Sequence, residues 1–166
     1  FVGSRGLGDV YKRQGFKMRF FTYSTLFVVS IFLSSVTSAA CSFDVEVGDY
    51  LKFSTSSMTA EKSCETISIN MKHTGKLPAK IMGHNWVLTK TADVQAVAME
   101  GMRAGLVAKY VPPGDSRVIA VSDVIGGGES TTLVVSTASL TAGDDYTYFC
   151  SFPGHSYSMR GKFQVI

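Results

Sequence analysis

The residues with the clearest chemical meaning lie near the C-terminus, in the segment Cys150-Ser-Phe-Pro-Gly-His155-Ser-Tyr-Ser-Met159. This segment places a thiol, an imidazole and a thioether at positions i, i+5 and i+9, and Pro153-Gly154 indicates a turn between the first two. Sulfur ligands suit Cu(I), imidazole suits both oxidation states of copper, and a weak axial thioether is typical of electron-transfer copper sites. The segment therefore predicts most of a copper site.

A second imidazole has to come from another part of the chain, and His84 in Gly83-His84-Asn85 is the candidate, 66 residues before Cys150. Cys150 ends a predicted strand and Met159 opens the last one, so the loop between them can bring its donors to one point. Because Gly83 has no side chain, its carbonyl oxygen can approach the metal from the side opposite Met159. We expect one copper ion per chain.

Each of these side chains has a simpler interpretation when it is taken alone. A single buried Cys or Met is usually a packing residue, and a single His usually has no ligand role. Zinc is an alternative metal because Cys and His suit it, but the thioether favours copper and three strong donors are too few for a closed structural zinc site. A nucleophilic Cys–His pair is the enzymatic alternative, and it lacks an obvious third orienting group.

The elements that must position these donors are strands. Alternation of apolar and polar residues, with β-branched and aromatic enrichment, marks seven segments: 43–47, 66–71, 86–88, 117–121, 132–135, 146–150 and 161–165. Turn signals separate them, and the pattern is typical of an antiparallel β-sandwich. Residues 91–102 are rich in Ala and Met and do not alternate, so we expect one helix there, inserted between two strands.

The N-terminal part of the chain has the pattern of an export signal. Basic residues precede an apolar run at 20–33, and small residues follow it up to Ala40. We expect residues 1–17 to be a non-native or untranslated leader, residues 18–40 a signal peptide cleaved near Ala40, and residues 41–166 one folded domain. A membrane anchor is the alternative, but the run is shorter than the ~20 residues that a spanning helix needs.

Charge and cysteine usage narrow the possible functions of residues 41–166. Residues 1–40 carry a net charge of +4 and residues 41–166 a net charge of −1, so the positive charge of the whole chain lies in residues 1–40. It therefore does not indicate that the domain binds nucleic acid. Three cysteines are an odd number for an exported protein. A Cys41–Cys64 disulfide that leaves Cys150 free accounts for all three, and an oxidising compartment permits it.

These residues together resemble the azurins, bacterial blue-copper proteins of the cupredoxin family. The segments that carry the resemblance are 41–42, 62–64, 77–78, 82–88, 115–120 and 149–155, and Met159 follows at the family's spacing. The likeness extends over residues 41–166.

The resemblance implies an all-β, Greek-key sandwich of about eight strands with one helical insertion. It also implies copper ligation by His84, Cys150 and His155, with Met159 and the carbonyl oxygen of Gly83 as distant axial donors. Asn85 is similar to a family asparagine that braces the ligand loops, and the backbone N–H of Phe152 to a hydrogen-bond donor for the Cys150 sulfur. The family's apolar surface for docking partners matches a set that we call the docking patch: Leu77, Met82, Met102, Phe152, Pro153 and Gly154.

We therefore expect a periplasmic, monomeric electron carrier, with no enzymatic turnover and no stable association with a membrane. It would exchange single electrons with c-type cytochromes, dehydrogenases or terminal reductases. The alternative is a copper-binding or delivery protein with the same ligands. A copper nitrite reductase would need further histidines, and only His73, interpreted as a partly buried turn residue, is left over. Trp86 is expected to face the core with His84 and to be a packing residue.

Overall fold

The computed structural model describes residues 41–166. The predicted leader (1–17), the signal peptide (18–40) with its cleavage point and the alternative membrane anchor lie outside the described residues. Within residues 41–166, no helix has both the length and the apolar character that crossing a bilayer requires.

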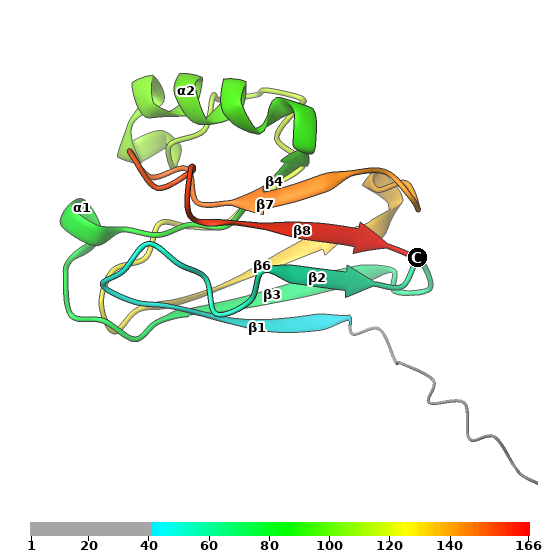
Figure 1. Cartoon of the computed structure of the whole chain (residues 1–166), viewed down its shortest axis with the longest axis horizontal. Helices are drawn as coiled ribbons and strands as arrows, with labels where there is room; N and C mark the ends of the chain where they lie inside the picture. Colours follow the sequence, from blue (N-terminus) through cyan, green and yellow to red (C-terminus); the bar gives the residue numbers. More distant parts are fainter. Residues whose placement is uncertain (1–40) are drawn as a thin grey trace, which may run out of the picture. The chain divides into compact units, whose positions relative to one another are not determined.

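The described residues form eight strands in two sheets (Figure 1). The three-stranded sheet has the order β1-β3-β6, with β1 at Ser42–Val47, β3 at Thr66–His73 and β6 at Ser130–Ser136. The five-stranded sheet has the order β2-β8-β7-β4-β5, and its strands are β2 (Ser57–Ala60), β8 (Arg160–Val165), β7 (Tyr146–Phe149), β4 (Val87–Lys90) and β5 (Ala120–Val121). The predicted all-β sandwich is confirmed.

Two features of the strands differ from the expectation. The pairs β1–β3 and β2–β8 are parallel, so the prediction of a purely antiparallel sandwich is wrong for them. The strand expected at 117–121 is reduced to two residues. Arg117 and Val118 instead belong to a turn, in which the N–H of Val118 donates to the Asp115 carbonyl and the Arg117 guanidinium bonds the Asp115 carboxylate.

The predicted helix is present and lies outside the sandwich. A short 3-10 turn, η1 (Thr91–Asp93), leads into α2 (Val94–Ala104), which ends at Gly105. The buried residues Val94, Val97, Ala98 and Gly101 follow helical spacing and form one face. This face packs with Val87 of β4 and Phe149 of β7, so α2 covers the outer side of the five-stranded sheet (Figure 1). Three shorter helical turns are α1 (Ala79–Met82), η2 (Leu106–Ala108) and η3 (Thr137–Ser139).

The main core lies between the two sheets and is centred on aromatic side chains. Trp86 has no exposed surface, and its indole stacks on Tyr148 with the ring centroids 5.4 Å apart. Phe163 of β8 meets the indole edge to face at 6.1 Å. The indole Nε1 has no hydrogen-bond partner among the described residues. Trp86 is therefore a packing residue, as the sequence indicates.

The disulfide predicted from the cysteine count is confirmed. Cys41 and Cys64 are bonded, with their Cα atoms 5.7 Å apart, and Cys150 is the free, buried cysteine of the described chain. The bridge ties the start of β1 to the loop between β2 and β3. The hydroxyl of Thr137 donates to the Cys64 carbonyl, so the bridged loop is also bonded to the turn after β6.

Replacing both bridged cysteines, Cys41→Ala with Cys64→Ala, should lower the free energy of unfolding by about 3 kcal/mol, because a bridge across a sequence separation of 23 restricts the unfolded chain. Guanidinium unfolding of the variant and of the wild type measures the difference. The free thiol of Cys150 is common to both proteins. Identical unfolding midpoints would contradict the prediction.

Candidate metal centre

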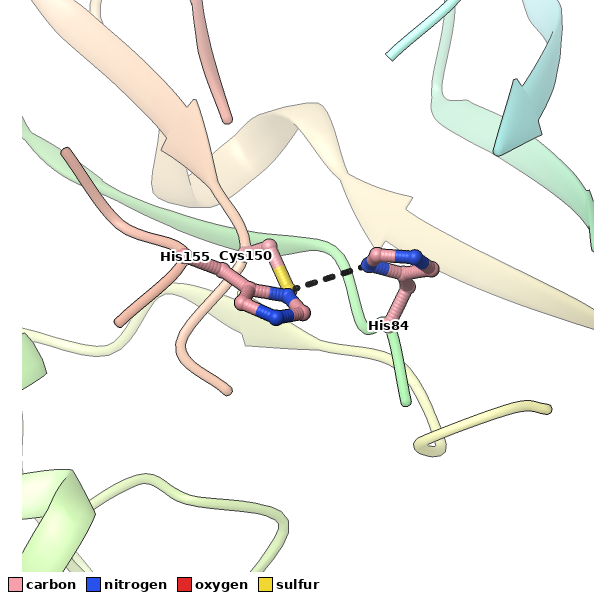
Figure 2. Close-up of side chains that lie close together, drawn as sticks. All are labelled: His84, Cys150 and His155. Carbon is pink, nitrogen blue, oxygen red and sulfur yellow. Dashed lines mark hydrogen bonds between the residues drawn. The ribbon is translucent and has the colours of Figure 1, made fainter. Parts of the chain in front are cut away.

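Two separate chain segments bring the three donors to one end of the sandwich. His84 lies just before β4, where its backbone pairs with Ile125, and Cys150 directly follows β7. His155 lies in the turn that leads to β8, and Gly154 with φ of 82° permits the reversal that the Pro-Gly pair predicts. The three side chains point toward one another (Figure 2).

Their spacing fits a single small ion. The Cys150 sulfur is 3.8 Å from Nδ1 of His84 and 3.6 Å from Nδ1 of His155. A sulfur donor about 2.3 Å and a nitrogen donor about 2.0 Å from the same ion lie roughly 3.5–3.7 Å apart at tetrahedral to trigonal angles, which is close to both observed distances. His84 and Cys150 have no exposed surface and His155 is 5% exposed. The residues present therefore fit a buried ion with one sulfur and two imidazole ligands.

The orientation of the His84 ring leaves Nδ1, the nitrogen that faces Cys150, free to bind a metal ion. Its Nε2 is 2.8 Å from the carbonyl oxygen of Gly48, so this nitrogen carries the proton and Nδ1 presents a lone pair toward the sulfur. The ring also lies between two other imidazoles, 5.1 Å from His73 and 5.0 Å from His155 between centroids. Hydrogen bonding and ring contacts together hold this ligand in place.

His73 differs from the sequence-based interpretation. It was expected to be a partly buried turn residue, but it is fully buried at the end of β3. Its Nδ1 accepts the N–H of Gly75 and its Nε2 lies 3.1 Å from the carbonyl oxygen of Met82. Both ring nitrogens are occupied, so His73 packs against His84 without offering a further donor. Only its long-range contacts reveal this role.

Burial sets the protonation states of the three donors. Burial raises the pKa of the Cys150 thiol to about 12, and hydrogen bonds from the backbone N–H groups of Asn85 and Phe152 oppose that rise. Burial also lowers the pKa of His155, to about 4, and that of His84. At neutral pH both imidazoles are uncharged and can donate lone pairs. A metal ion that binds here has to displace the thiol proton.

The two ligand segments are joined through Asn85 and Ser151, which directly follow His84 and Cys150. The side-chain oxygen of Asn85 accepts the N–H of Ser151 at 2.9 Å, and its amide nitrogen donates to the Ser151 hydroxyl at 2.8 Å. The same amide nitrogen donates to the carbonyl oxygen of Lys109 at 2.7 Å. Sequence reasoning named Asn85 but missed Ser151 and Lys109, because no local pattern points to them.

The two expected axial residues lie beside this cluster. Met159 is fully buried, its N–H donates to the His155 carbonyl, and its own carbonyl accepts the N–H of Cys150. Gly83 is buried at the end of α1, where an added Cβ would lie 2.3 Å from the Ala79 carbonyl oxygen and 3.1 Å from the Phe152 ring. No side chain fits at position 83, so only its backbone can face the site.

The docking patch is partly assembled in the structure. Met102 of α2, Phe152 and Gly154 line one cleft between the helix and the ligand loop. Leu77 and Met102 are 37% and 46% exposed, and Pro153 is also exposed. Phe152 itself is buried at 8% exposure, with its ring 4.5 Å from that of His155. Apolar side chains thus reach the protein surface close to the His155 ligand.

Comparison with known proteins gives consistent matches. The family model described as copper binding proteins, plastocyanin/azurin family, matches residues 39–166. The azurin of Bordetella pertussis is 48% identical over 139 residues, which are 84% of this chain and 93% of that protein. The azurin of Pseudomonas denitrificans is 50% identical over 123 residues, 74% of this chain and 96% of its own length.

A solved structure matches the fold as well. The azurin Az-iso2 of the obligate methylotroph Methylomonas sp. strain J is 45% identical, with a TM-score of 0.74, and the match covers 77% of this chain and 99% of that protein. The family model and the azurin relatives, taken with the convergence of the three donors, show that His84, Cys150 and His155 are arranged as a copper site.

The metal-free protein should lose stability as the pH falls from about 6.5 to about 4. In this pH range a histidine of the unfolded chain becomes protonated, whereas the buried His155 of the folded protein, with its pKa of about 4, stays neutral. Protonation therefore favours the unfolded state, and the lowered pKa of His84 adds to this effect. The expected loss is on the order of 2–3 kcal/mol. Chemical unfolding in the presence of a chelator at several pH values measures it.

The variant His155→Gln is the control, because it removes one of the two histidines while keeping a polar side chain. Its unfolding free energy should change less between these pH values than that of the wild type. Equal pH dependence of the two proteins would refute the assignment to His155.

Proposed function

The chain belongs to the plastocyanin/azurin family of copper binding proteins, and on this basis we propose that it is a blue-copper protein that carries single electrons between redox partners. The observation that carries the proposal is the convergence of one thiol and two neutral imidazoles in a buried site. Copper bound there would alternate between Cu(I) and Cu(II) and so take up and release one electron.

The protein would contribute rigidity. The ligands are His84, Cys150 and His155, with Met159 and the Gly83 carbonyl proposed as weak axial donors. Two backbone N–H groups, of Asn85 and Phe152, donate to the Cys150 sulfur, which tunes the ligand and holds it still. Because burial and hydrogen bonds restrict all of these groups, the donor positions need to change little between the oxidation states, and the barrier to electron transfer stays low.

We place the exchange of electrons at the docking patch. Its exposed residue Met102 lines the same cleft as Phe152 and Gly154, beside the His155 turn, where a partner would come closest to the buried donors. Small interfaces of this kind suit brief encounters between redox proteins. The partners would be c-type cytochromes, dehydrogenases or terminal reductases, and the carrier would act as a monomer without binding nucleic acid.

We further propose that the protein works in the periplasm, with residues 41–166 as the mature domain. The Cys41–Cys64 disulfide supports an oxidising compartment. The leader at 1–17 and the signal peptide at 18–40 remain predictions from the sequence.

A copper delivery role and an enzymatic role are less well supported. Delivery requires ready release of the ion, whereas the ligands here are buried and fixed by hydrogen bonds. A copper enzyme with a second site would need additional histidines, and within residues 41–166 the remaining one, His73, has both ring nitrogens bonded. A copper-transfer assay to a competing chelator, set against rapid stopped-flow reduction, separates delivery from electron transfer.

The first test is optical. The Cu(II)-loaded protein should absorb intensely toward the red end of the visible spectrum through charge transfer from the Cys150 sulfur, and Cys150→Ser should abolish this band. Titration with Cu(II) in a spectrophotometer gives the result. A colourless Cu(II) complex of the folded wild type would rule out the proposed site.

The second test concerns the docking patch. Met102→Glu should slow electron self-exchange between two copies by about tenfold or more, because a carboxylate in an apolar contact is desolvated and repels its counterpart. Val134→Glu is the matched control, since Val134 is 59% exposed on β6 and lies outside the docking patch. NMR line broadening in mixtures of the two oxidation states measures the rates. Equal slowing by both variants would place the exchange elsewhere.

A further inference from the structure

Two consecutive residues outside the ligand set have a backbone conformation that L-amino acids rarely adopt. Lys109 has φ of 56° and Tyr110 has φ of 52°, and within residues 41–166 they are the non-glycine residues with positive φ. A side chain with a Cβ is disfavoured in this region, and such conformations persist where surrounding contacts require them. Neither residue was singled out by the sequence.

The backbone of Lys109 contacts both ligand segments. Its carbonyl oxygen accepts the Asn85 amide at 2.7 Å and the Ser151 hydroxyl at 3.3 Å. Asn85 is the neighbour of His84, and Ser151 is the neighbour of Cys150. One carbonyl oxygen therefore joins the segments that carry two of the three donors, in addition to the bonds that Asn85 and Ser151 make with each other.

The side chain of Tyr110 is linked to the third ligand through Phe152. Its ring meets Phe152 edge to face with a centroid distance of 5.2 Å, and Phe152 in turn lies 4.5 Å from the ring of His155. The two left-handed residues thus contact the neighbours of all three donors, although neither touches a donor itself.

A glycine near the end of α2 allows the Lys109–Tyr110 backbone to pack closely against the helix. A Cβ on Gly101 would lie 2.0 Å from the carbonyl oxygen of Tyr110, so only glycine lets the chain pass this close to the helix. Hydrogen bonds from Lys109 N to the Leu106 carbonyl and from Tyr110 N to the Gly105 carbonyl close the turn. The helical insertion therefore supports the metal centre through this turn.

We propose that the Lys109–Tyr110 backbone is a positioning element of the metal centre, whose left-handed conformation directs the Lys109 carbonyl oxygen to Asn85 and Ser151 and so sets the spacing of His84 and Cys150. The Lys109 side chain is not needed for this, because its ammonium pairs with Asp123 at an exposed position, where ion pairs contribute little. The role of the spacing in electron transfer rests on the proposed function.

The test replaces Lys109 by residues that differ in their tolerance of the left-handed region. Lys109→Val, with a β-branched side chain, should disfavour it, whereas Lys109→Gly and Lys109→Asn should retain it. All three variants remove the ion pair with Asp123, so the last two are controls for the lost charge. Gly114→Ala controls for strain as such, since Gly114 has φ of 72° and an added Cβ would meet nothing within 4 Å.

Two readouts are measured. In the metal-free protein, amide hydrogen exchange of Ser151, whose N–H is bonded to Asn85, should become about tenfold faster in Lys109→Val than in Lys109→Asn. In the Cu(II)-loaded protein, the electron paramagnetic resonance spectrum and the reduction potential should shift in Lys109→Val alone. Gly114→Ala should lower stability and leave both readouts unchanged.

The inference is overturned if Lys109→Val loses stability as Gly114→Ala does but keeps the wild-type exchange rate and spectrum. If Lys109→Val does not fold, Lys109→Thr imposes the same β-branched restriction with a polar side chain at this exposed position, and its exchange rate and spectrum are judged by the same outcomes. Because the exchange experiment uses metal-free protein, it decides the positioning role even if the optical test contradicts the proposed function.

Discussion

The sulfur of Cys150 lies between two imidazoles where water does not reach it, and this placement determines what the surrounding structure has to provide. Burial makes an isolated thiolate unfavourable, as the pKa of about 12 reflects. The N–H groups of Asn85 and Phe152 offset only part of that cost. A bound cation offsets the rest, because it pairs with the thiolate and with imidazoles that burial keeps uncharged. The site is thus suited to a metal ion and unsuited to a free nucleophile.

Holding such a site requires support from several directions. The five-stranded sheet, in which β4 and β7 are neighbours, fixes the segments before β4 and after β7, while the helical insertion α2 covers the outer side of the same strands. From α2 the chain turns through Lys109 back to the ligand segments. The three donors are therefore held by their two segments and by the hydrogen bonds between these segments. A rigid arrangement of this kind is what a one-electron carrier needs, because the ligands then rearrange little.

Much of the fold could be predicted, because it depends on local patterns. The alternation of apolar and polar residues predicted most strands, and the absence of this alternation at 91–102 predicted the helix. The short strand β2 was missed, since four residues carry too little alternation to stand out. The parallel pairing of β1 with β3 was also missed, because the alternation of apolar and polar residues indicates which face of a strand is buried but not which strand it pairs with, or in which direction.

The sequence by itself determined the chemistry: a thiol, a thioether and an imidazole within ten residues, a turn between them, and an even pair of cysteines left for a disulfide. These are properties of residue type and short spacing. The sequence offered His84 as a candidate, and the tertiary structure brings it to Cys150 across 66 residues. Only the tertiary structure decided that His73 packs behind His84 and that the carbonyl of Lys109 joins the two ligand segments. Such contacts depend on how distant segments pack and on backbone torsions that the packing stabilises. Neither produces a periodic pattern of residue types in the sequence.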